Sequence, residues 1–86
     1  MPYRLEFSAK AARQFKGLAH PVRAFLQPRL ESLAVNPQHP AVTKLSEHES
    51  LYRLRAGDYR VFFEIQEENQ VILIVKVGHR RDVYRK

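Results

Sequence analysis

Arginine side chains recur at two-residue spacing in the C-terminal half of the chain. Arg53 and Arg55 are two residues apart, and Arg60 and Phe62 are two residues apart in the next alternating stretch. Alternate residues of a β-strand point to the same face of a sheet. Guanidinium groups bind phosphate oxygens through paired hydrogen bonds, and an aromatic ring beside them can stack on a base. The spacing therefore predicts a sheet face that binds nucleic-acid phosphates, provided that the strands pair in a suitable register.

More basic residues follow the last apolar stretch. Arg80 and Arg81 come directly after it and would add to the arginine face. Tyr84 lies close behind, and neighbouring positive charge would lower the pKa of its phenol from about 10, so that it could accept a proton. The alternative is structural: Tyr84 packs the tail against the sheet, and the strand arginines only solvate an exposed face, pairing with Glu64 or Asp82.

Histidine and cysteine usage gives no sign of a metal centre. The chain has no cysteine, and its four histidines, at positions 20, 39, 48 and 79, lack the spacing of metal ligands. We therefore predict no metal and no cofactor. His79 adjoins the basic cluster, and an imidazole can both accept and donate a proton, which makes it a candidate supporting residue.

Two helices are predicted before the arginine-bearing strands. Residues 3–7 alternate between apolar and charged, as a strand does, and Ser8 then suits the N-cap of a helix with apolar residues at helical spacing. Pro21 suits the start of a second helix, which Asn36 and Pro37 end. Pro28 lies inside that helix and predicts a kink. The two helices are expected to form a hairpin.

The rest of the chain is predicted to be a β-meander. Residues 37–50 show no sustained period and are expected to form a loop, with Lys44 and Leu45 as anchors. Residues 51–56, 59–66 and 71–77 are predicted strands. The third is apolar on both faces, which predicts a central position in the sheet. The tail after Gly78 is expected to line an edge. The expected fold is α+β: a two-helix hairpin packed on a small antiparallel β-sheet of about four strands.

Length and charge limit the class of protein. With 86 residues, a net charge of +6 and a pI near 10.1, the chain suits one domain, residues 1–86, with an anionic partner. RNA, DNA, an acidic protein and a membrane surface all fit that charge. No basic leader precedes an apolar core, and no apolar run approaches the roughly 20 residues of a membrane span. A cytoplasmic protein without membrane insertion is expected.

Three motifs together resemble the RelE/ParE superfamily of bacterial and archaeal toxins. They are Leu-Tyr-Arg-Leu-Arg at residues 51–55, Gly-Asp-Tyr-Arg-Val at residues 57–61 and Val-Gly-His-Arg-Arg-Asp-Val-Tyr at residues 77–84. The resemblance covers nearly the whole chain, including the initial strand, the hairpin and the meander, and it implies a RelE-like fold. RelE-type members are endoribonucleases that cut mRNA in the ribosomal A site, whereas ParE-type members poison DNA gyrase on the same fold.

The resemblance to RelE-type mRNA interferases implies roles for individual side chains. Those that fall on the family's catalytic positions are Arg53, Arg55, Arg60, Arg80 and Tyr84. The implied reaction needs no metal: the ribose 2′-hydroxyl attacks the adjacent phosphate and leaves a 2′,3′-cyclic phosphate and a 5′-hydroxyl. The arginines would stabilise the negative charge of the transition state.

The sequence departs from the best-known RelE active site at two positions. Lysines stand there in the places of Arg53 and Arg55, and arginine does not readily exchange a proton. We therefore expect these two arginines to act electrostatically. Proton transfer then falls to Tyr84 as the base, with Arg80 near the leaving oxygen, or to His79 or Lys44 as substitutes. Arg81 and the stacking ring of Phe62 would support substrate binding.

The resemblance also implies partners, and it leaves alternatives open. An acidic or amphipathic RelB-like antitoxin would neutralise the protein, the ribosome and mRNA would be its targets, and the toxin–antitoxin complex would bind operator DNA. One alternative is a ParE-type gyrase poison, which would break DNA and leave mRNA intact. The other is a catalytically inactive toxin-like binding module within an operator-binding repressor complex.

Overall fold

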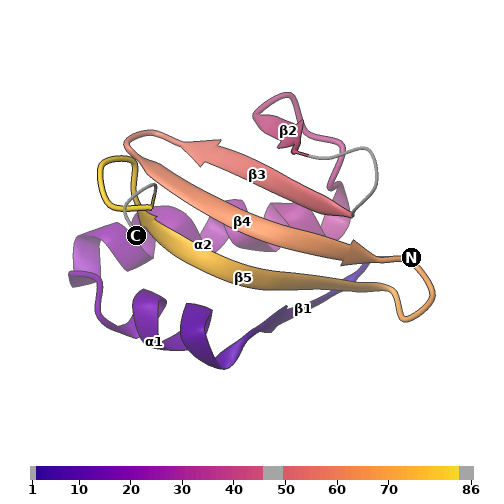
Figure 1. The fold of residues 1–86 in the computed structure, drawn as a ribbon, viewed down its shortest axis with the longest axis horizontal. Coiled ribbons are helices and arrows are strands. Elements are labelled where there is room, and N and C mark those ends of the chain that lie inside the picture. Colours follow the sequence, from indigo (N-terminus) through magenta and orange to yellow (C-terminus); the bar gives the residue numbers. More distant parts are fainter. Residues whose placement is uncertain (1, 46–49, 84–86) are drawn as a thin grey trace.

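The computed structural model describes residues 2–45 and 50–83 of the chain. This part contains, in order, β1 (Arg4–Phe7), α1 (Ala9–Lys16), α2 (His20–Val35), β2 (Val42–Lys44), β3 (Leu51–Ala56), β4 (Tyr59–Gln66) and β5 (Val71–His79). The strands form one sheet in the order β1-β5-β4-β3-β2, and both helices lie on one side of it (Figure 1). The predicted α+β fold with a helix hairpin packed on a small sheet is confirmed.

The sheet is mixed. β3, β4 and β5 form the predicted antiparallel meander, and the turn between β3 and β4 uses Gly57 at a φ of 60°, which glycine adopts without a steric penalty. β1 pairs with β5 in parallel, with Arg4 opposite Val71 and Phe7 opposite Ile74. This corrects the expected antiparallel pairing at one edge. The long connection between β1 and β5 lets the two strands run in the same direction, which a tight hairpin would not allow.

A short fifth strand replaces part of the expected loop. β2 pairs antiparallel with β3 at the other edge of the sheet, and Thr43 lies opposite Arg53. The count of about four strands therefore rises by one. β2 has only three residues, too few for an alternating pattern to stand out in the sequence. β5 has a strand on each side, as its apolar sequence predicted, but β4 occupies the middle of the sheet.

The helices begin where their capping residues predict. The Ser8 hydroxyl accepts a hydrogen bond from the Ala11 amide at 3.1 Å, which caps α1, and Pro21 lies in the first turn of α2. α2 ends at Val35, with Asn36 as its C-cap. It runs through Pro28 without interruption, and the kink expected there remains a prediction.

The hydrophobic core lies between the sheet and the two helices. Its largest fully buried side chains include Leu26, Leu30 and Leu33 of α2 and Phe63 of β4. Val61, Phe63 and Ile65 are buried toward the helices, as their alternation along β4 predicts. The intervening residues of β4 therefore point to the other face of the sheet.

The chain after β5 turns back over the face opposite the helices instead of lining an edge. The amides of Asp82 and Val83 both donate to the carbonyl of His79, which forms a turn. Val83 is buried, and a Cβ atom at Gly78 would lie 2.8 Å from its Cγ1 atom. Because Gly78 pairs with Arg60, this contact places Val83 on the side of the sheet that carries Arg60.

Adding a methyl group at Gly78 should destabilise this turn. Overpacking usually costs about 1–3 kcal/mol, so we expect Gly78→Ala to lower the free energy of unfolding by that amount in urea denaturation. Gly17→Ala is the matched control. Gly17 has a φ of −76°, and its added Cβ would meet no atom closer than 3.4 Å. Equal loss of stability in both variants would contradict the close packing of Val83 on Gly78.

Within the part of the chain that the structure describes, neither helix is long and apolar enough to cross a membrane.

Candidate nucleic-acid interface

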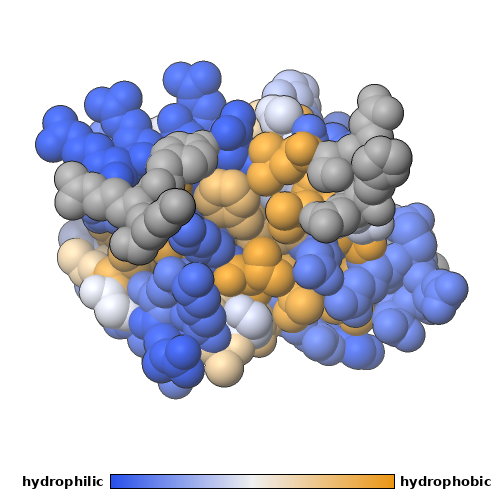
Figure 2. All heavy atoms as spheres, in the orientation of Figure 1, coloured by the Kyte–Doolittle hydropathy of each residue, from blue (hydrophilic) through white to orange (hydrophobic). Residues whose placement is uncertain are grey.

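The face of the sheet opposite the helices carries the side chains that the sequence predicted to lie together. We call it the open face and define it by Arg53, Arg55, Arg60, Phe62 and Lys76. Arg53 lies opposite Phe62, which lies opposite Lys76, and Arg55 lies opposite Arg60. Figure 2 looks onto this face and shows hydrophobic surface across its middle, with hydrophilic side chains gathered toward the β3–β4 turn. The register therefore brings Arg53, Arg55 and Arg60 onto one face and places Arg55 directly opposite Arg60.

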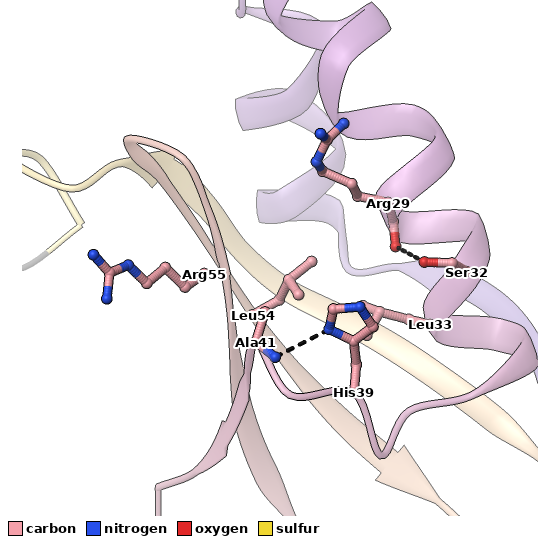
Figure 3. A pocket seen from close by; sticks show the side chains of 7 residues that line it. All are labelled: Arg29, Ser32, Leu33, His39, Ala41, Leu54 and Arg55. Carbon is pink, nitrogen blue, oxygen red and sulfur yellow. Dashed lines mark hydrogen bonds between the residues drawn. The ribbon is translucent and has the colours of Figure 1, made fainter.

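Arg55 leaves β3 on the open face. Figure 3 shows its side chain pointing away from a cavity of about 300 Å³ that lies between α2 and β3. Leu54, the preceding residue, points to the helix side and is buried, whereas Arg55 is exposed. The predicted alternation of β3 between an apolar and a charged face is thus confirmed at these positions.

Arg55 and Arg60 are direct neighbours across the β3–β4 pair. Like charges in this arrangement repel each other, so the pair costs free energy until an anion neutralises it. The Arg60 guanidinium is held in place by its Nη1 atom, which donates to the carbonyls of Gly57 at 2.8 Å and Tyr59 at 2.9 Å. These contacts reduce the entropy that Arg60 would lose on binding a phosphate group.

Arg80 contacts the turn between β3 and β4, to which Arg60 also bonds. Its amide donates to the Asp58 carbonyl at 2.7 Å, and its Nε atom lies 3.6 Å from Asp58 Oδ1. Both side chains are more than half exposed, so this ion pair contributes little stability and can exchange for a pair with phosphate. Residues 57–59 therefore hold the Arg60 side chain and the Arg80 backbone at one end of the open face.

Lys76 is a member of the open face that the sequence analysis did not single out. Its Nζ atom lies 5.9 Å from the centroid of the Phe62 ring and donates a hydrogen bond to the Val83 carbonyl. The lysine thus connects the aromatic ring of the face to the C-terminal turn. Lys76 can be recognised in the sequence because it is the one charged residue in the apolar stretch 71–77.

Two candidate supporting residues lie away from the open face. His79 pairs with Tyr59, packs edge-on against that ring at 5.4 Å, and accepts from the Arg81 amide through Nδ1 at 3.1 Å. Because Gly78 lies on the open face, the next residue points to the helix side. Lys44 pairs with Tyr52 at the exposed edge strand β2, whereas its neighbour Thr43 pairs with Arg53. Arg81 is exposed in the turn that follows β5.

Tyr84, the predicted base, lies outside the described residues. The residue before it, Val83, is buried against Gly78 beside Arg60, so the described chain ends over the open face. Among residues 2–45 and 50–83, the structure contains no group of three or more His, Cys, Asp or Glu side chains that could hold a metal ion. The arrangement offers fixed positive charge to an anion and a partly exposed aromatic ring to a base.

The sequence matches the model of a protein family described as the ParE toxin of the type II toxin–antitoxin system parDE, over residues 5–84. Among characterised relatives, the chain is 28% identical to toxin RelG of Mycobacterium tuberculosis over the full length of both proteins. It is 29% identical to the mRNA interferase toxin RelE of Escherichia coli, covering 93% of this chain and 85% of that protein.

A solved structure supports the same relationship. The RelBE2 toxin–antitoxin complex from Mycobacterium tuberculosis contains a chain that matches with a TM-score of 0.81 and 26% identity. The match covers 93% of this chain and 100% of that one. The family match spans all three motifs, and the fold similarity includes the sheet that carries the open face. The chain belongs to the family of ParE toxins of type II toxin–antitoxin systems, within the RelE/ParE superfamily and with relatives of RelE type.

Proposed function

We propose that this toxin is a RelE-type endoribonuclease that cuts mRNA in the ribosomal A site and so inhibits translation. The observation that carries the proposal is the clustering of Arg60 and Arg80 on one turn, at the end of the open face from which the chain continues to Tyr84. Arginines fixed around one site stabilise a phosphate whose negative charge increases in the transition state. The similarity to the RelE mRNA interferase of Escherichia coli supports the same assignment.

In the proposed reaction the ribose 2′-hydroxyl loses its proton to the Tyr84 phenolate, and its oxygen forms a bond to the adjacent phosphorus. The bond from phosphorus to the 5′-oxygen of the next nucleotide breaks. Arg80 stabilises the charge on that leaving oxygen, which takes a proton from water, while Arg53, Arg55 and Arg60 surround the phosphate. The products are a 2′,3′-cyclic phosphate and a 5′-hydroxyl, and the step consumes no cofactor.

Lys76 positions the C-terminal turn in this scheme. Its hydrogen bond to the Val83 carbonyl fixes the residue that precedes Tyr84, and its charge adds to the open face. Lys76→Met should lower the cleavage rate at least about tenfold, since hydrogen bonds from charged groups contribute about 1.5–3 kcal/mol. Lys76→Arg keeps the charge and a donor and should retain most of the activity. Single-turnover cleavage rates measure both, and a fully active Lys76→Met variant would exclude the role.

The open face also suits the proposed antitoxin. An acidic or amphipathic RelB-like chain would neutralise the arginines and cover the hydrophobic surface in the middle of the face (Figure 2). An antitoxin bound in this way would keep RNA from reaching the open face. The toxin–antitoxin complex would bind operator DNA. A target on the ribosome implies a cytoplasmic location, and we take residues 1–86 to be one toxin domain.

Reconstituted translation tests the proposal. We expect the purified toxin to cut an mRNA within the codon that occupies the A site of a stalled ribosome, and to leave the same mRNA intact without ribosomes. The alternative is a gyrase poison, which the ParE description of the matching family favours. That function predicts cleaved DNA in a supercoiling assay with gyrase and uncut mRNA on the ribosome. A protein inactive in both assays would be the non-enzymatic binding module.

A further inference from the structure

A second cavity, of about 230 Å³, lies at the tip of the β3–β4 hairpin on the side of the helices. Pro21, Val22 and Phe25 of α2 line one wall, and residues 57–59 of the turn line the other. The tip of the Phe25 ring packs against Gly57, where an added Cβ would lie 3.4 Å from Phe25 Cζ. Phe25 nevertheless leaves 38% of its surface exposed. The cavity thus presents apolar and aromatic surface to solvent within a strongly basic protein.

Three arginine side chains contact residues that line this cavity, although none of the three lines it. Arg29 lies 3.7 Å from the centroid of the Phe25 ring. Arg60 donates to the Gly57 carbonyl, and Arg80 lies against Asp58, so the turn that lines the cavity also holds two proposed phosphate-binding residues. A ligand that complements this arrangement combines a flat apolar group with negative charge. A nucleotide has both, with its base and its phosphate separated by one ribose.

We propose that this cavity binds a nucleobase of the RNA substrate while the phosphate next to it contacts Arg60 or Arg80. The base would insert between Phe25 and Tyr59, since aromatic side chains bind unstacked bases. The assignment of this cavity to the binding site for substrate RNA rests on the proposed function. Nucleotide binding itself does not, because it is measured on the isolated toxin without ribosomes.

Asp58 gives the cavity a preference among bases. Its carboxylate is exposed at the rim and can only accept hydrogen bonds. Uracil presents carbonyl oxygens on both sides of its ring N–H, and they would repel the carboxylate. Cytosine has the same size and presents an amino group in place of one carbonyl, and that group would donate to Asp58. The cavity should therefore disfavour uracil.

NMR titration of the isotope-labelled full chain tests the base pocket. Adenosine 5′-monophosphate should shift resonances of Val22, Phe25 and Tyr59, and ribose 5-phosphate should shift those of the turn and of Arg80 but not of Phe25. Phe25→Ser should weaken binding of the nucleotide at least about tenfold and leave ribose 5-phosphate binding unchanged, because base stacking is lost. Val35→Ser removes another exposed apolar side chain of α2 and should change neither the affinity for the nucleotide nor the affinity for ribose 5-phosphate.

The preference for cytosine is tested by the ratio of two affinities. Cytidine 5′-monophosphate should bind about tenfold more tightly than uridine 5′-monophosphate to the wild type, and Asp58→Asn should bring the two affinities close together. Any change in the phosphate contact of Arg80 affects both nucleotides equally and cancels in the ratio. Asp82→Asn removes the same charge from the neighbouring turn and should leave the ratio unchanged.

Three results would overturn the inference. They are equal affinity for adenosine 5′-monophosphate and ribose 5-phosphate, full nucleotide binding by Phe25→Ser, and Phe25 shifts that appear only with an acidic amphipathic peptide, which would assign the cavity to a protein partner. Any of them leaves ribosomal cleavage intact as a function. Conversely, base-dependent binding by a protein that cuts no mRNA would reject the proposed function and retain the pocket.

Discussion

Replacing Arg60 with alanine should lower the rate of mRNA cleavage on the ribosome by about 10²–10³-fold, the usual effect of removing one group that stabilises transition-state charge. The guanidinium is fixed by two backbone carbonyls and stands opposite Arg55. It therefore meets the phosphate without first losing rotational freedom. Loss of a partly exposed side chain from β4 leaves the core unchanged, so the urea midpoint should stay close to that of the wild type.

Two further variants separate the geometry of Arg60 from its charge. Arg60→Lys keeps the charge but loses the planar guanidinium, which binds two phosphate oxygens at once. Its rate of mRNA cleavage should therefore lie between that of the wild type and that of Arg60→Ala. Arg13→Ala removes the same charge from the exposed end of α1 and should cut mRNA at the wild-type rate. A loss of activity in Arg13→Ala as large as in Arg60→Ala would mean that net charge, not the open face, drives the reaction.

Replacing Tyr84 with phenylalanine should reduce the cleavage rate by about 10²–10⁴-fold, because the variant keeps the ring and lacks the hydroxyl group that we propose as the proton acceptor. Binding to the ribosome should change little, so the loss should appear in the rate at saturating ribosome concentration. The measurement is a single-turnover time course on stalled ribosomes, with a pH profile for the wild type and the variant.

Tyr52→Phe is the control for this substitution. Tyr52 packs its ring on Phe63 at 5.7 Å, on the side of the sheet that faces the helices, and its hydroxyl has no place in the proposed reaction. We expect Tyr52→Phe to cleave at the wild-type rate. A Tyr84→Phe variant as active as the wild type would reject the phenol as the base and leave His79 and Lys44, the predicted substitutes, as the groups to test.

Strand alternation predicted the side of the sheet that each β3 and β4 residue occupies, because the twofold period of a strand leaves only two choices. The same rule assigns His79 to the helix side, but only once it is known that Gly78, the residue before it, lies on the open face. Register came from the structure: nothing in the sequence states that Arg55 faces Arg60, or that a bulge between Phe62 and Phe63 brings Lys76 opposite Phe62.

Other features depended on contacts distant in the sequence. β2 has too few residues to show a period, and it exists because the edge of β3 supplies its hydrogen bonds. The turn after β5 was expected at an edge because its residues are basic, but Val83 packs on Gly78 and draws the backbone over the open face. The cavity beside Phe25 lies between α2 and the β3–β4 turn, and no local sequence pattern predicts that these two segments lie side by side.

The most direct test of the proposed function is to map RNA 5′-ends across the transcriptome within minutes of inducing the toxin. We expect new 5′-hydroxyl ends that lie inside translated regions, recur with the three-nucleotide phase of codons, and disappear in the Arg60→Ala and Tyr84→Phe strains. Growth arrest with intact mRNA and broken chromosomal DNA would contradict it and assign the toxin to DNA gyrase. Cuts without codon phase, or cuts in untranslated RNA at the same frequency, would contradict the dependence on the ribosome.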